Sequence, residues 1–166
     1  MSKKNIILFS FLGLISGLLS WFAFGSSGGS ENSNFFLVYG PGWIFGLVIS
    51  SHIYFLYRKY LYFHITYIFI SIGAYYVALK LFFLLNNENS STAALFTAGL
   101  VGGLILAGGL RLKYPIKIEH LLLVAILGGL AGIIKPDLGI FPIWQTIVST
   151  AIGFSLYKTS TTRIGI

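Results

Sequence analysis

Six long segments of this chain contain no charged residue, and this feature constrains the fold more than any other. They cover residues 5–30, 32–57, 60–79, 89–110, 120–134 and 138–157. Most reach or approach the roughly 20 apolar residues that an α-helix needs to cross about 30 Å of hydrocarbon. Only 9% of the 166 residues are charged, against about 25% in an ordinary soluble domain. We therefore predict an all-α polytopic membrane protein, a bundle of six transmembrane helices.

The predicted spans leave little of the chain for anything else. We place them at about residues 5–25, 36–57, 61–85, 91–110, 117–134 and 139–157. The remaining loops are too short to bury a core of their own, so residues 1–166 are expected to form a single transmembrane domain. The sequence contains no cysteine, which excludes disulfides, thiolate catalysis and cysteine metal ligands.

Basic residues alternate between the predicted loops, and lysine and arginine favour cytoplasmic loops. The loops on one side contain a single lysine together with Glu31, Glu88 and Asp137. Nine basic residues lie at the chain ends or in the other loops: Lys3, Lys4, Arg58, Lys59, Arg111, Lys113, Lys117, Lys158 and Arg163. We therefore expect both termini on the cytoplasmic side of the plasma (inner) membrane. The net charge of +7 is then a topological signal, with recognition of lipid headgroups as the alternative, and nucleic acid is not an expected partner.

The N-terminal segment has two interpretations. Lys3 and Lys4 followed by an apolar run could form a cleavable signal peptide. The run over residues 6–24 is longer than a signal peptide needs and ends near Trp21 and Phe22, which favour the membrane interface. A retained first helix is the favoured interpretation.

Small residues recur four positions apart in three of the predicted helices. Such spacing places them on one helix face and allows a second helix backbone to approach closely. The pairs that we expect to pack helices together are Gly13 with Gly17, Gly99 with Gly103, and Gly128 with Gly132. The alternative is that these faces bind another copy of the chain or a different membrane protein.

Two predicted helices begin with proline two residues before tryptophan. Pro41 precedes Trp43, and Pro142 precedes Trp144. Proline suits a first helical turn and tryptophan suits the headgroup level, so both pairs are expected to mark helix starts. Alternatively, the glycines flanking Pro41 could break that helix and expose backbone polar groups to a cavity.

Lys80 is the clearest example of a charged residue within a predicted span, where ionisable groups are costly and are candidates for function. Thr66, Gly73 and Lys80 are seven residues apart, so they share one helical stripe, which we expect to face inward. The plain alternative is that Lys80 extends to the membrane surface. A polar pocket open to the outer side and suited to a neutral or anionic solute could be built from Lys80, Tyr76, Gln145, Trp43 and Trp144.

No pattern in the chain predicts catalysis, a cofactor or a metal. Glu119 and His120 are adjacent, so they point about 100° apart on a helix and lack the spacing of a ligand pair. The serines lack a nucleophile-elbow motif, and the glycine-rich stretches lack the ending of a phosphate-binding loop. We predict no catalytic residue, no cofactor and no metal site.

The size, the six helices, the inward termini and the spaced small residues of the first helix resemble the substrate-binding components of vitamin importers. This resemblance concerns architecture, and it implies a solute-binding role but carries over no substrate residue. Two functions are therefore expected. The first is binding or translocation of a small solute, with a partner because nothing here can hydrolyse ATP. The second is a non-catalytic subunit or assembly factor that docks through its glycine-rich faces.

Overall fold

The computed structural model describes residues 3–24, 35–57, 61–86, 91–134 and 140–162. These ranges form six α-helices: α1 (Lys3–Phe24), α2 (Phe35–Tyr57), α3 (Leu61–Leu85), α4 (Ser91–Arg111), α5 (Ile118–Ile133) and α6 (Ile140–Thr162). The predicted all-helical fold is confirmed over the described ranges, and each helix lies close to its predicted position.

Three of these helices are long and apolar enough to cross a membrane. They are α1 over Lys3–Ala23, α3 over Leu61–Leu85 and α4 over Ser91–Arg111. Helix α5 is apolar but shorter. These lengths and compositions agree with a membrane-associated protein.

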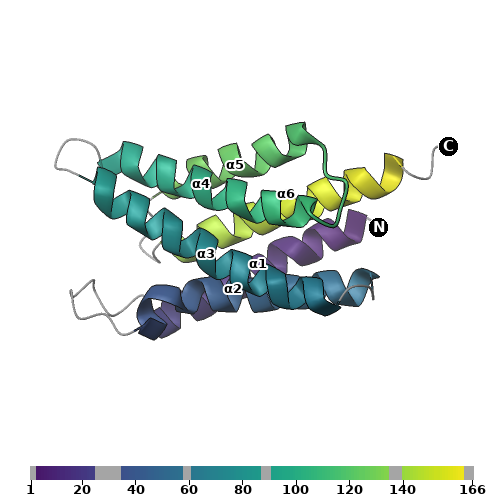
Figure 1. The fold of residues 1–166 in the computed structure, drawn as a ribbon, viewed down its shortest axis with the longest axis horizontal. Helices are drawn as coiled ribbons and strands as arrows, with labels where there is room; N and C mark the ends of the chain where they lie inside the picture. The colour runs from purple at the N-terminus through teal and green to yellow at the C-terminus, as the bar shows by residue number, and fades with distance from the viewer. Residues whose placement is uncertain (1–2, 25–34, 58–60, 87–90, 135–139, 163–166) are drawn as a thin grey trace.

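The helices are arranged in a ring. Each helix packs against its neighbour in sequence, and α1 packs against α6 to close the ring (Figure 1). The α1–α6 and α4–α5 contacts are the most extensive, and α6 also touches α2 and α4. Figure 1 shows the N- and C-terminal ends of the chain at the same end of the bundle. We call this end, where Lys3, Lys4 and Lys158 lie, the basic end.

The interior is made of large apolar side chains from all parts of the ring. The fully buried ones include Phe9, Phe45, Ile49, Ile53, Tyr67, Leu106, Leu110, Ile152 and Leu156. Large apolar side chains also cover the outside, as Phe22, Phe55 and Leu84 illustrate. Uncharged polar side chains such as those of Ser16, Ser71 and Gln145 are also buried. An apolar exterior of this kind suits lipid as the solvent.

Close backbone approach holds the two most extensive helix pairs together. A Cβ atom at Gly103 of α4 would lie 2.8 Å from the carbonyl oxygen of Val124, and one at Gly128 of α5 would lie 2.6 Å from that of Gly99. Both contacts involve backbone atoms, so only glycine fits there without moving the helices. At Gly132 the nearest atom would be the carbonyl oxygen of Leu95, 2.5 Å away.

Helices α1 and α6 also approach each other closely at glycine residues. A Cβ atom at Gly13 would overlap Ser149 on α6, and one at Gly17 would overlap the backbone of Pro142. All six glycines singled out from the sequence thus face a neighbouring helix of the same chain.

Both proline-containing helices are continuous over the residues that the structure describes. Helix α2 begins at Phe35 and runs through Pro41, which therefore lies inside the helix rather than at its start. The carbonyl of Gly42 accepts a hydrogen bond from Ser71 Oγ at 2.8 Å. Pro142 occupies the first turn of α6, as predicted for a helix start. The expectation that Pro41 lies in the first turn of its helix is wrong, because α2 already begins at Phe35.

Candidate functional site

Gln145 lies inside the interface between α1 and α6, with 1% of its surface exposed. Its Oε1 accepts a hydrogen bond from Ser16 Oγ at 2.5 Å, and its Nε2 donates to Ser20 Oγ at 3.1 Å. Ser20 Oγ in turn donates to the carbonyl oxygen of Ser16 at 2.9 Å. Both ends of the amide are therefore engaged by α1, and Gln145 links the two helices that close the ring.

The two tryptophans of the predicted pocket occupy different surroundings. Trp144 is half-buried and packs against Phe45, with ring centroids 6.1 Å apart. A Cβ atom on Gly102 would lie 3.2 Å from Cζ2 of Trp144, so this ring fills space between α6 and α4. Trp43 is 41% exposed and meets the edge of Phe69 on α3 at a centroid distance of 6.4 Å.

Lys80 and Tyr76 lie together on the outside of α3. The ammonium of Lys80 is 5.7 Å from the centre of the Tyr76 ring, within the range of a cation–π contact. Tyr76 is 36% exposed and stacks on Tyr39 of α2, with centroids 5.5 Å apart and an interplanar angle of 23°. The structure thus brings together two of the five predicted pocket residues, while Gln145 is enclosed between α1 and α6. A solute pocket that unites all five stays a prediction.

The expected inward direction of the Thr66, Gly73 and Lys80 stripe is wrong. Thr66 and Lys80 are exposed, and a Cβ atom on Gly73 would meet nothing within 4 Å. The face of α3 that points into the bundle carries Phe63, Tyr67, Ser71 and Ala74 instead. Burying the large rings of Phe63 and Tyr67 requires the helix to turn its polar stripe outward.

Three serines important to helix packing were not predicted from the sequence. Ser16 and Ser20 bind Gln145, and Ser71 reaches across from α3 to α2. A signal for two of them exists, since Ser16 and Ser20 lie next to Gly13 and Gly17 on the same side of one helix. Reading serine as a small residue equal to glycine would have revealed this face.

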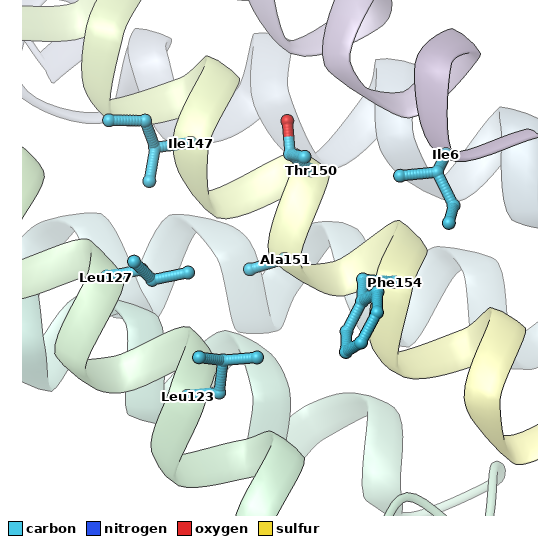
Figure 2. A pocket seen from close by; sticks show the side chains of 7 residues that line it. All are labelled: Ile6, Leu123, Leu127, Ile147, Thr150, Ala151 and Phe154. Carbon is cyan, nitrogen blue, oxygen red and sulfur yellow. The ribbon is translucent and has the colours of Figure 1, made fainter.

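A hollow lies between α5 and α6, near the start of α1 (Figure 2). It is an open groove with a volume of about 380 Å³, and nearly all of its wall is apolar. The side chains that line it are Ile6, Leu123, Leu127, Ile147, Thr150, Ala151 and Phe154.

The three histidines pack against aromatic rings. His52 meets Phe9 at a centroid distance of 4.8 Å, and His64 meets Tyr54 at 4.9 Å. His120 meets Phe154 at 5.9 Å. Within the described ranges, no group of three histidine, aspartate or glutamate side chains is placed to hold a metal ion.

Comparison with known proteins gives no further guidance. The chain matches no protein-family model, and no curated protein or solved structure is significantly similar to it. The function of the chain is therefore inferred from the geometry of these residues.

Proposed function

We propose that the chain spans the plasma (inner) membrane six times, with both termini on the cytoplasmic side. Three helices are individually suited to cross a bilayer, and the others pack alongside them in one ring. Basic side chains gather at the end of the bundle where the chain begins and ends, as expected of a cytoplasmic face. Lys80 then lies toward the outer surface of the membrane.

We propose further that the protein is a non-catalytic subunit or assembly factor that binds another membrane protein through α2 and α3. We call the surface concerned the docking face, and it comprises Trp43, Thr66, Phe69, Gly73, Tyr76 and Lys80. The observation that carries this proposal is the position of Lys80. Its charge projects from the outside of the ring, a little over one helical turn before α3 ends at Leu85.

The chemistry of this face favours a partner helix that carries a carboxylate. An ammonium among lipid tails is costly, about 2.5–3.5 kcal/mol at the bilayer centre and less toward the surface. Within the described residues, the ammonium of Lys80 contacts the Tyr76 ring, and the ion pairs found there do not involve Lys80. An aspartate or glutamate at the same depth on a neighbouring protein would neutralise it.

The shape of the docking face also suits another helix. Open space over Gly73 allows a second backbone to approach, and the exposed ring of Phe69 provides an apolar contact beside it. The glycine-rich faces are less suitable, because Gly13, Gly99 and Gly128 pack against helices of the same chain. We therefore place docking on α2 and α3.

Site-specific photo-cross-linking in the native host tests this proposal. Benzoylphenylalanine replaces Phe69, which is 61% exposed on the docking face, or Phe11, which is 56% exposed on α1 and serves as the matched control. We expect one membrane protein to cross-link from position 69 and not from position 11. Lys80→Met, which keeps the apolar stem and removes the charge, should abolish that product while the protein stays folded.

Other outcomes would separate the alternatives. Identical products from positions 69 and 11, or a product that Lys80→Met leaves unchanged, would contradict the docking proposal. A cross-link between two copies would also contradict it, since two Lys80 side chains repel each other. A small solute that purifies with the wild-type chain and is lost in Lys80→Met would instead support the solute-binding hypothesis.

A further inference from the structure

The apolar groove between α5 and α6 is on the side of the ring away from the docking face. Ile147 and Phe154 lie seven residues apart on α6, so the groove follows this helix for about 10 Å. Leu123 and Leu127, one turn apart on α5, form its opposite wall (Figure 2). An apolar groove of this length fits part of an extended hydrocarbon chain.

The groove has no polar feature that would bind a polar solute. Its one polar side chain is that of Thr150, whose hydroxyl points away from the leucines of α5 (Figure 2). That oxygen contacts Ser10 Oγ of α1 at 2.8 Å and donates to the carbonyl oxygen of Thr146 at 2.6 Å. The hydrogen-bonding capacity of the hydroxyl is thus used within the protein.

Basic side chains surround the end of the groove at Phe154. Lys158 lies one turn further along α6, with its ammonium 5.6 Å from the centre of the Phe154 ring. Lys3 precedes Ile6 by three residues and therefore shares its side of α1. His120 packs against Phe154, and its Nδ1 is buried without a hydrogen-bond partner in the described part of the chain.

A carboxylate at the same end is already engaged. Glu119 is 3.7 Å from the ammonium of Lys117 and 3.9 Å from Nε2 of His120. In the described part of the chain, Glu119 is the one acidic residue, whereas Lys3, Lys4 and Lys158 all lie at the basic end, so this end carries a net positive charge. The end of the groove therefore complements an anion.

We propose that this groove binds an anionic phospholipid. One acyl chain lies along Leu123, Leu127 and Phe154, and the phosphate is held by Lys158 and Lys3 at the basic end. Any lipid can fill the apolar part, because surrounding lipid tails are equally apolar. Selection among lipids therefore comes from the two lysines, and this inference does not depend on the docking proposal.

Competition between two lipids with the same acyl chains tests the charge requirement. The delipidated protein is given equal amounts of dioleoylphosphatidylglycerol and dioleoylphosphatidylcholine, and bound lipid is measured by native mass spectrometry. A lysine near an anionic headgroup contributes about 1 kcal/mol, or about fivefold in affinity. Two lysines predict a preference of roughly 30-fold for phosphatidylglycerol.

Two pairs of variants locate the site. Lys158→Gln should reduce the preference about fivefold, whereas Lys113→Gln, which removes an equal charge from the α4–α5 connection, should leave it unchanged. Leu123→Trp should fill the groove and release the lipid. Leu122→Trp is its control, because Leu122 is 50% exposed on the adjacent face of α5.

Three results would overturn the proposal. Equal retention of both lipids by the wild-type chain would show that charge does not select the ligand. An equal loss of preference in Lys158→Gln and Lys113→Gln would show a general surface effect. The third result is that excess inorganic phosphate displaces phosphatidylglycerol from the wild-type chain, or that Leu123→Trp still retains phosphatidylglycerol. Either outcome would show that the groove does not hold the acyl chain.

Discussion

Substitution of Gly103 by alanine should force α4 and α5 apart. The new Cβ atom would lie 2.8 Å from the carbonyl oxygen of Val124 and 3.2 Å from the Cα atom of Ala125. Both are backbone atoms, so a change of side-chain rotamer cannot relieve the overlap. The two helices must separate until these distances approach ordinary contact, and this loosens the packing along their shared face.

The expected loss of stability in Gly103→Ala is best compared with a control substitution in the same helix. A Cβ atom on Gly108 of α4 would meet nothing within 4 Å. Alanine raises helix propensity by about 1 kcal/mol at either position, so this gain cancels when the two variants are compared. Overpacking typically costs about 1–3 kcal/mol. We therefore expect Gly103→Ala to be about 1–3 kcal/mol less stable than Gly108→Ala.

Reversible unfolding in mixed micelles measures this difference. The fraction of denaturing detergent is raised while helicity is followed by circular dichroism, and the free energies of unfolding of the two variants and the wild type are compared. Gly108→Ala should be at least as stable as the wild type. Equal stability of the two variants, or a lower stability of Gly108→Ala, would refute the close approach of α4 and α5.

Two further predictions concern ring closure and orientation. Gln145→Leu removes the hydrogen bonds to Ser16 and Ser20, and because such bonds contribute about 0.6 kcal/mol each on average in membranes, we expect a loss of about 1–2 kcal/mol in the same titration. Unchanged stability would show that this amide does not join α1 to α6. The cysteine-free sequence also allows single-cysteine labelling: an impermeant maleimide should modify Asn86→Cys in intact cells and Lys113→Cys only after lysis. Labelling of Lys113→Cys from outside would contradict the proposed orientation.

The sequence alone determined the helices of this protein. Long charge-free runs of apolar residues form helices whether or not other contacts are known, because every backbone polar group in lipid must be paired within its own segment. The predicted limits differ most at α6, which was expected to end at Tyr157 and ends at Thr162. Glycine spacing also indicated the faces on which α1, α4 and α5 are closely approached by neighbours.

Tertiary structure alone decided what each face meets. The seven-residue spacing of Thr66, Gly73 and Lys80 correctly places them on one stripe. The interior of the bundle is nevertheless occupied by Phe63 and Tyr67, which lie on the other side of α3. Gln145 is likewise enclosed because α1, far away in sequence, brings Ser16 and Ser20 against α6. Periodicity tells which residues share a face, whereas the neighbour that covers the face depends on contacts between distant segments as the ring closes.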